Sequence, residues 1–182
     1  MEWIIPGTTL TGKREDARYV ENHFTTMFAA GGLVLSQVAN LTGLEPYTIQ
    51  NWVKRGFLTK PDRKRYSMRQ VCRILNINML KSAMSLDEIC HLLGYINGAR
   101  DYEGDDLIDD TRLYFMFVQL AARARYIGGN QNWDDALLEV TAEYQEPVPG
   151  AREKLVAVLK IMLTTWVAAQ LRFQAEKMMQ AL

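Results

Sequence analysis

The fold of the chain is decided by residues 33–58, LVLSQVANLTGLEPYTIQNWVKRGFL, which predict two short helices joined by a turn. Ser36 belongs to the residue types that cap helix N-termini, and Gly43 can take the left-handed conformation that ends a helix. Pro46 suits the first turn of the second helix, where its missing N–H would have no partner in any case. Two short helices with a glycine between them are typical of a helix-turn-helix.

The second helix of this pair has a polar face. Ile49 and Val53 fall on its apolar side, with Trp52 at the edge of that side. The side chains expected to point outward are Tyr47, Gln50, Asn51 and Lys54. Because glutamine and asparagine amides can pair with adenine in the major groove, this face is a candidate for base recognition.

The next stretch is basic and too short for another helix. Residues 60–66 are KPDRKRY, in which Pro61 and Asp62 favour a tight turn, so we expect a small hairpin, or wing. Although the formal net charge of the chain is zero, residues 54–69 hold only one acid, Asp62, and seven basic side chains. The basic residues are Lys54, Arg55, Lys60, Arg63, Lys64, Arg65 and Arg69. Such a concentration of positive charge predicts contact with phosphates.

Two further helices are predicted by their starting residues. Ser67 with Gln70, and Ser85 with Glu88, have the spacing of capping boxes. After the second box, apolar residues follow at i, i+3, i+4 and i+7, which predicts one buried stripe: Leu86, Ile89, Cys90 and Leu93.

This order of elements resembles the N-terminal domain of MerR-type regulators over residues 33–93. A closer similarity is to a group of bacterial proteins that share a domain of unknown function, DUF1836; it lies in NWVK (51–54), KP (60–61), KRYS (64–67) and KSAMSLDEI (81–89). The MerR resemblance implies DNA binding by the second helix and the wing, and a dimer formed through a C-terminal helix.

The chain departs from the MerR pattern in three ways. Gln50 and Asn51 stand where an Arg-Tyr pair is usual, Glu45 stands where Ser or Thr usually precedes the proline, and the wing is shorter. A promoter-twisting mechanism is therefore not implied. The residues expected to contact DNA are Tyr47, Gln50, Asn51, Lys54, Arg55, Lys60, Arg63, Lys64, Arg65 and Tyr66, although for Tyr66 we favour a place beneath the wing.

The sequence predicts a mostly-α chain in three parts. An arm and a helix occupy residues 1–32, with a loop or arm over 1–14 and a helix over 15–30 that Gly31 and Gly32 end. The winged helix-turn-helix occupies 33–98. A helical effector or dimerisation domain occupies 99–182, with helices over 110–127, 133–144 and 151–180.

The last helix is the longest, and its apolar stripe is the expected interface of a homodimer: Leu155, Leu159, Met162, Trp166 and Phe173. The aromatic residues of this C-terminal bundle suit either an effector pocket or ordinary core, and we favour core because no convergent polar group accompanies them.

An acidic stretch separates the two halves: Asp101, Glu103, Asp105, Asp106, Asp109 and Asp110. It suits either a divalent-metal loop or a solvated linker whose last acids favour a helix start. Since the alternating acids and the final glutamate of a calcium-binding EF-hand are absent, we favour the linker.

Composition and motifs narrow the class of protein. A hydrophobic content of 48% with 23% charged residues is ordinary for a soluble globular protein. Cys72 and Cys90 lack ligand spacing and are expected to be reduced thiols. The N-terminus does not resemble a signal peptide, and residues 155–169 are too short and include Lys160, so we expect no membrane span and a cytoplasmic protein.

Catalysis is not indicated. The chain has two histidines, His23 and His91, and neither a phosphate-binding loop nor a nucleophile elbow, so we expect no enzyme, metal or cofactor. The leading hypothesis is a sequence-specific regulator that binds double-stranded DNA as a homodimer; a small-molecule effector is possible but unsupported. The alternative is a non-catalytic interaction or architectural module that uses the winged fold.

Overall fold

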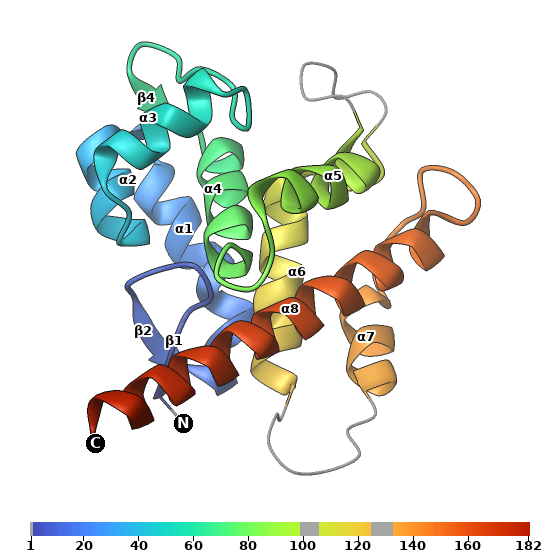
Figure 1. The fold of residues 1–182 in the computed structure, drawn as a ribbon. Coiled ribbons are helices and arrows are strands. Elements are labelled where there is room, and N and C mark those ends of the chain that lie inside the picture. The colour runs from blue at the N-terminus through green and yellow to red at the C-terminus, as the bar shows by residue number, and fades with distance from the viewer. Residues whose placement is uncertain (1, 99–105, 125–132) are drawn as a thin grey trace.

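The computed structural model describes residues 2–98, 106–124 and 133–182. Its elements in chain order are β1 (Glu2–Ile4), β2 (Thr11–Lys13), the 3-10 helix η1 (Arg14–Tyr19), α1 (Val20–Phe28), β3 (Leu33–Val34), α2 (Leu35–Thr42), α3 (Pro46–Lys54), β4 (Arg65–Tyr66), α4 (Met68–Leu80), α5 (Leu86–Asn97), α6 (Asp110–Arg123), α7 (Trp133–Thr141) and α8 (Ala151–Gln180). Its strands form two small antiparallel pairs, β1 with β2 and β3 with β4 (Figure 1). The prediction of a mostly-α fold is confirmed.

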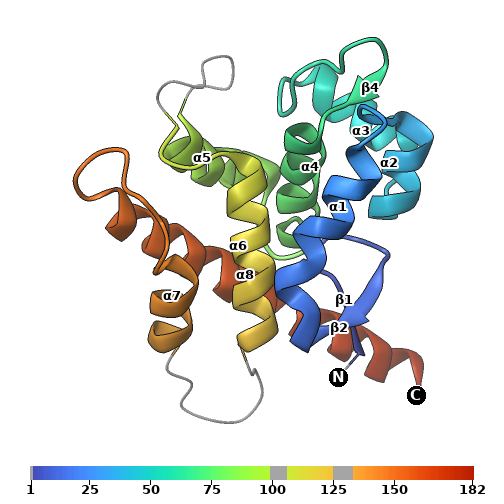
Figure 2. The same ribbon diagram turned by 180° about the vertical axis from the view of Figure 1, so that it is seen from behind.

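Helix α4 lies at the centre of the molecule, with α1 and α6 beside it in both ribbon views (Figure 1 and Figure 2). It begins at the predicted capping box, in which Ser67 Oγ accepts the N–H of Gln70 and Gln70 Oε1 accepts the N–H of Ser67. Nine of its thirteen residues are buried, because α2, α5 and α8 also pack against it. The second capping box, Ser85 with Glu88, likewise starts α5.

The predicted pair of short helices is present as α2 and α3. Gly43 has a φ of 69° at the end of α2, and Pro46 is the first residue of α3, as expected. The prediction that Ser36 caps α2 is wrong, since the helix begins at Leu35 and its N-cap residue is Val34. Val34 pairs with β4 and stays extended, and its N–H donates to Oε1 of Gln37.

The N-terminal segment is not the loop or arm that the sequence predicts. Strands β1 and β2 form a hairpin, and the loop between them is fixed by contacts to α4 and α6. Gly7, at a φ of 76°, lies so close to Leu75 that a Cβ would be 2.6 Å from the Leu75 carbonyl oxygen. Asn78 Nδ2 donates to Gly7 O at 2.8 Å, and Tyr114 Oη donates to Pro6 O at 2.9 Å. Pro6 and Gly7 therefore allow this loop to pack closely against α4 and α6.

The helix predicted over 15–30 is divided into η1 and α1. Val20 and Phe24 face the core, where the ring of Phe24 meets Phe115 edge-on with centroids 5.3 Å apart. Tyr19 and His23, in the same segment, are exposed. The glycines at 31 and 32 have φ values of 86° and 68° and end this segment as predicted.

Helices α6, α7 and α8 pack against one another, as expected of a C-terminal bundle. The predicted stripe of α6 is buried throughout: Leu113, Phe117, Leu120, Ala121 and Ala124. However, α6 and α8 also contact α4, so one connected core extends from Trp3 to Trp166. The core is thus continuous across the boundary predicted after residue 98. Ile127, the Gly-Gly-Asn stop at 128–130 and the Asn132 cap lie outside the described residues.

Helix α8 has the bounds that the sequence predicts, and it crosses the molecule in front of α6 in Figure 1. Among the described residues it is the one helix long and apolar enough to cross a membrane. That is weak evidence, because 44% of its apolar window is buried against the protein's own core.

Candidate nucleic-acid interface

One face of α3 is open to solvent at the end of the molecule opposite the C-terminus of α8 (Figure 1). Ile49 and Trp52 are buried in the core, so Trp52 does not lie at the edge as predicted. The side chains predicted to point outward do so: Tyr47, Gln50, Asn51 and Lys54 are all exposed. Tyr47 is 70% exposed, so its ring is available to a binding partner.

The loop after α3 is fixed at both ends. Phe57 and Leu58 are buried, and the guanidinium of Arg55 lies 4.5 Å from the centroid of the Phe57 ring. Gln70 Nε2, at the start of α4, donates to Thr59 Oγ1 and to Lys60 O, both at 2.9 Å. These contacts hold the backbone from which the basic side chains extend.

The turn of the wing lies at Arg63 and Lys64, immediately after the predicted Pro61 and Asp62. Arg65 N donates to Asp62 O at 2.7 Å and the two residues form an antiparallel bridge. Arg63 and Lys64 have φ values of 45° and 65°, the positive values that a two-residue hairpin turn of type I′ requires. This turn directs consecutive basic side chains out from the molecule.

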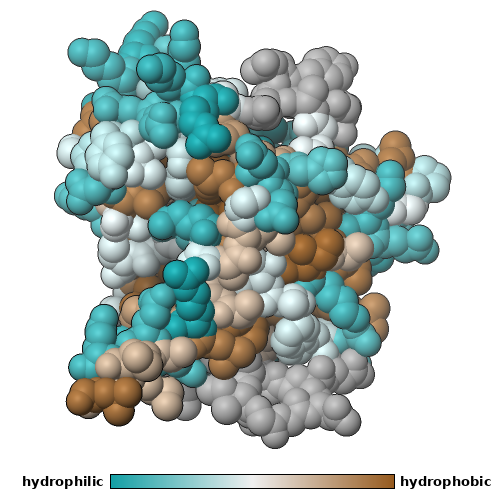
Figure 3. Space-filling view, viewed as in Figure 1, coloured by the Kyte–Doolittle hydropathy of each residue, from teal (hydrophilic) through white to brown (hydrophobic). Residues whose placement is uncertain are grey.

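Basic side chains surround the exposed face of α3. Six are exposed and form no ion pair among the described residues: Lys54, Arg55, Lys60, Arg63, Lys64 and Arg65. Arg65 Nη1 donates to Gly32 O at 3.0 Å, which leaves its charge uncompensated. In the space-filling view, hydrophilic side chains cover this end of the molecule (Figure 3). We call these six side chains and the open face of α3 the basic surface.

Some of the predicted site residues lie elsewhere. Tyr66 is buried beneath the wing, where burial raises the pKa of its hydroxyl, so it has no exposed surface to offer DNA. Arg69, counted with the basic stretch, pairs with Asp106. Of the residues predicted at a dimer interface, only Phe173 is exposed; the other four pack inside the chain: Leu155, Leu159, Met162 and Trp166.

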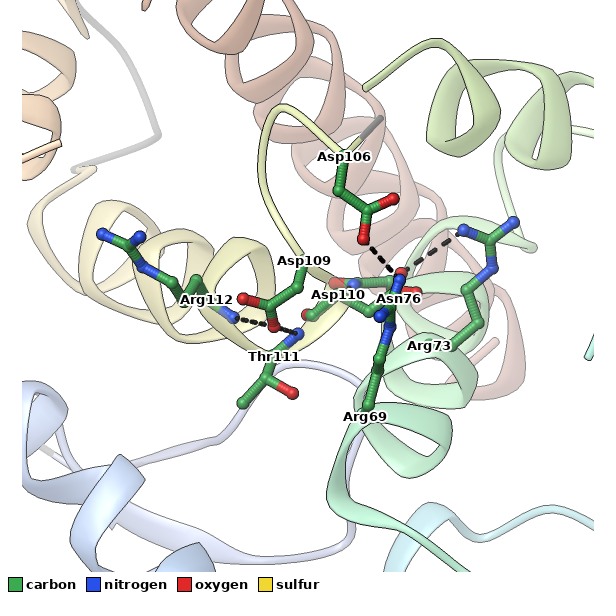
Figure 4. A network of polar contacts seen from close by, with 8 residues as sticks. All are labelled: Arg69, Arg73, Asn76, Asp106, Asp109, Asp110, Thr111 and Arg112. Carbon is green, nitrogen blue, oxygen red and sulfur yellow. Dashed lines mark hydrogen bonds and ion pairs between the residues drawn. The ribbon is translucent and has the colours of Figure 1, made fainter. Parts of the chain in front are cut away.

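Sequence reasoning missed a polar network under the basic surface (Figure 4). Arg69 and Arg73, one helical turn apart on α4, pair with Asp106 and Asp110. Asp109 caps α6 by accepting the N–H groups of residues 111 and 112. Asp109 and Asp110 lie at the start of α6, as predicted for the last acids of this stretch, whereas the side chain of Asp106, 8% exposed, lies in an ion pair and is not solvated. The acids at 101, 103 and 105 lie outside the described residues. The i, i+4 spacing of the two arginines was the available signal.

Within this network, the carboxyl group of Asp110 is buried and its pKa is shifted. Burial raises the pKa of its carboxyl group, and the neighbouring guanidinium of Arg73 opposes that rise. The closest contact of the pair, from Arg73 Nη1 to Asp110 Oδ1, is 3.4 Å. That distance exceeds the 2.7–2.9 Å typical of strong charge-assisted hydrogen bonds. The pair is thus buried and joined by a long contact.

Groups that could support catalysis or a metal are not brought together in the described part of the chain. No three His, Cys, Asp or Glu side chains there are placed to hold a metal ion. Both histidines are exposed, and neither cysteine forms a disulfide. Burial raises the pKa of the Cys72 thiol well above its ordinary value, which disfavours the reactive thiolate.

Comparison with known proteins gives one match. Residues 18–117, a little over half of the chain, match the domain of unknown function DUF1836. The matched segment runs from η1 to the middle of α6, and so contains the basic surface and the network beneath it. No curated protein and no solved structure matches the chain.

Proposed function

The chain belongs to the DUF1836 family, and we propose that it binds double-stranded DNA through the basic surface. The observation that best supports this proposal is the exposure of six basic side chains around one open helix face, none of them in an ion pair with another described residue, in a protein with no net charge. A surface of that kind attracts phosphates, whose contacts provide most of the affinity of DNA-binding proteins.

In this proposal α3 enters the major groove. The groove is about 12 Å wide and accepts a helix, and the nine residues of α3 extend roughly 13 Å. Gln50 and Asn51 present amides suited to adenine, and Tyr47 lies at the N-terminal end of the same face. Lys54 and Arg55, at the other end of the helix, are positioned for backbone phosphates.

The wing forms the second contact. Because Arg63 and Lys64 extend from a tight turn, they would reach the phosphates that flank the groove occupied by α3. This division of roles is that of a winged helix-turn-helix and agrees with the resemblance to MerR-type regulators. We accordingly propose a cytoplasmic, non-catalytic transcriptional regulator that needs no cofactor.

A dimer is part of the proposal, with its interface on the outer face of α8. Seven exposed residues of this face recur at alternating spacings of four and three: Ala157, Ile161, Thr164, Ala168, Leu171, Ala175 and Met178. This is the spacing of a coiled-coil seam. We call this set the outer seam.

A second copy of the chain fits the outer seam. Two copies of α8 placed antiparallel overlap from Ile161 to Met178, about 26 Å, with Ile161 against the partner's Met178 and Ala168 against the partner's Leu171. From residue 171 onward every residue of α8 is exposed. Because an isolated helical segment of that length is marginal in water, a partner would stabilise it.

The alternative function is an interaction or architectural module in which the same surface binds a protein. The high exposure of Tyr47 supports it, because tyrosine is enriched at protein interfaces. An acidic protein partner would also respond to salt, so the discriminating observation is direct binding of purified DNA and its dependence on sequence.

The test is a titration of labelled duplex DNA from the protein's own upstream region at several salt concentrations. The variant is Arg63→Asn with Lys64→Gly, which removes two charges and keeps residues that suit a type I′ turn. The log–log salt slope should become shallower by about 2, since each phosphate contact contributes roughly 0.9. Lys81→Ala with Lys154→Ala removes two exposed charges elsewhere and should leave the slope unchanged. Absent binding, or equal slopes in all three proteins, would refute the proposal.

A further inference from the structure

A pocket of about 300 Å³ lies directly beneath the basic surface. Its walls come from the loop after α3, the first turns of α4, the end of α5 and the start of α6. Its volume is at the lower end of the range for small-molecule sites, so it suits a metabolite of modest size. Phe57 and Leu58 form an apolar wall, and the buried polar lining is Arg73, Asn97 and Asp110.

Asn97 is the clearest sign that this pocket has a ligand. Its side chain is 4% exposed, and neither its amide nitrogen nor its amide oxygen has a hydrogen-bond partner. A buried amide without partners is destabilising by an amount comparable to a lost hydrogen bond, and such groups are rare in native proteins. A group of this kind at the wall of a pocket is explained if a bound molecule completes its hydrogen bonds.

Arg73 supplies the charge. Its guanidinium has five N–H donors, and its one contact, with Asp110, is the long 3.4 Å contact described above. The remaining donors of Arg73 and the amide N–H₂ of Asn97 line the same pocket. Lys60, at its rim, adds a further positive charge. The carboxylates of Asp62 and Asp110 also line the pocket, and Arg73 and Asn97 are its buried side chains with N–H donors.

We propose that this pocket binds a small organic anion that has a carboxylate or a phosphate group. The oxyanion would accept hydrogen bonds from Arg73, which suits two parallel bonds to such a group. The amide of Asn97 would donate to the same molecule and accept from a neighbouring hydroxyl or amide of it. Phe57 and Leu58 would cover its carbon atoms.

The pocket is also placed to link this ligand to the basic surface. Thr59, Lys60 and Asp62 line it, and all three belong to the loop and wing that bear the basic side chains. An anion bound against them would change the position or the charge of that loop. This second part of the inference rests on the proposed function, whereas binding of the anion does not.

The test uses the full chain without DNA. Inorganic phosphate and succinate are titrated separately, and the NMR signals of the Asn97 side-chain amide and the Arg73 Nε–H are followed. Saturable shifts of both signals are expected with at least one of the two anions, and the anion that produces them identifies the phosphate or the carboxylate source. If neither anion gives saturable shifts, the proposal is refuted.

Two variants make the test specific. Asn97→Leu should weaken binding about tenfold or more while raising the urea midpoint, because it replaces an unpartnered buried amide with an apolar group of similar shape. Asn40→Leu, the same change at an exposed position of α2, should leave anion binding unaltered. Arg73→Gln with Asp110→Asn removes both buried charges at little change in size and should abolish binding in a folded protein. Unchanged binding in either pocket variant would overturn the assignment.

Discussion

Arg63 and Lys64 combine exposed charge with a backbone conformation that favours glycine. Both have positive φ values, and for residues other than glycine the left-handed region is unfavourable by about 1 kcal/mol or more. Lys64→Gly should therefore raise the free energy of unfolding by about 0.5–1 kcal/mol, as measured by urea denaturation. The same variant should lower DNA affinity because it loses a phosphate contact.

Lys60→Gly is the matched control for this change. Lys60 is exposed and basic but is not among the residues with positive φ, so glycine there should lower stability slightly while also weakening DNA binding. If Lys64→Gly and Lys60→Gly shifted the unfolding midpoint in the same direction, strain at the turn would not be the cause.

Asp110 should give stability a dependence on pH that opposes the usual behaviour of carboxylates. Because burial raises its pKa in the folded state, the folded protein holds a proton at Asp110 that the unfolded chain releases above about pH 4. The contribution of Asp110 to the free energy of unfolding is complete at pH values below its pKa in the unfolded chain. It is lost as the pH rises through its pKa in the folded protein, with a slope of at most about 1.4 kcal/mol per pH unit.

The comparison that isolates this effect is between wild type and Asp110→Asn, unfolded in urea at a series of pH values. The stability of wild type relative to the variant should fall as pH rises above about 4 and then level off. Parallel stability curves for wild type and Asp110→Asn would contradict a raised pKa of Asp110.

At this scale the sequence was informative about surfaces and less so about buried polar groups. The outward residues of α3 follow from helical periodicity, because Ile49 fixes which side is buried. Arg69 could not be assigned in the same way, since its stem is apolar and its head is charged, and the partner that decides its burial comes from a distant part of the chain. Asp106, thirty-seven residues after Arg69, is such a partner.

At the scale of elements, the N-terminal hairpin should depend on Gly7 for its attachment to α4. Gly7→Ala introduces a Cβ that would lie 2.6 Å from the Leu75 carbonyl oxygen, in addition to the strain of a positive φ. We expect a loss of about 2–4 kcal/mol in the free energy of unfolding. Gly31→Ala is the control, because its φ is 86° but a Cβ there would meet nothing within 4 Å, so the loss should be about 1 kcal/mol.

Calorimetry or urea denaturation of both variants would measure the difference between strain alone and strain with a steric clash. Equal losses would show that the hairpin moves away from α4 without consequence. The result also bears on why this segment was mistaken for a flexible arm. Glycine, proline and threonine predict irregular backbone, but whether such backbone is mobile or docked depends on α4 and α6, which the local sequence does not describe.

Helix starts were predicted better than helix partners for a related reason. The capping boxes at Ser67 and Ser85 are local, since three or four consecutive residues complete the hydrogen bonds. The start of α2 was misplaced because Val34 is held extended by strand β4, thirty residues later in the chain. The local sequence predicts the start of a helix where neighbouring residues complete the capping hydrogen bonds. It fails where a distant segment pairs with the same residues.

At the scale of the whole molecule, the bounds of α8 were predicted correctly, but the packing partner of its apolar stripe was not. Its bounds were predicted, but the stripe assigned to a second subunit, which includes Leu155 and Trp166, packs against α4, α6 and α7. A helix with apolar residues on several sides has more than one candidate interface. Only the packing of the remaining chain reveals which side is left for a partner, and that side is the outer seam.

Leu171 and Phe173 therefore provide a decisive comparison. The two side chains are 50% and 51% exposed, but only Leu171 belongs to the outer seam, because Phe173 lies about 200° around the helix from it. A charge buried in a helix pair is strongly unfavourable, so Leu171→Glu should convert a dimer into a monomer at micromolar concentration. Phe173→Glu should leave the dimer intact.

Light scattering coupled to size-exclusion chromatography measures this directly, with urea denaturation to verify that both variants fold. A dimeric wild type that Phe173→Glu dissociates and Leu171→Glu does not would place the interface on the other side of α8. A monomeric wild type would remove the dimer from the proposal. DNA binding through α3 and the wing would then have to be explained by one copy, with a correspondingly smaller set of phosphate contacts and a shallower salt slope.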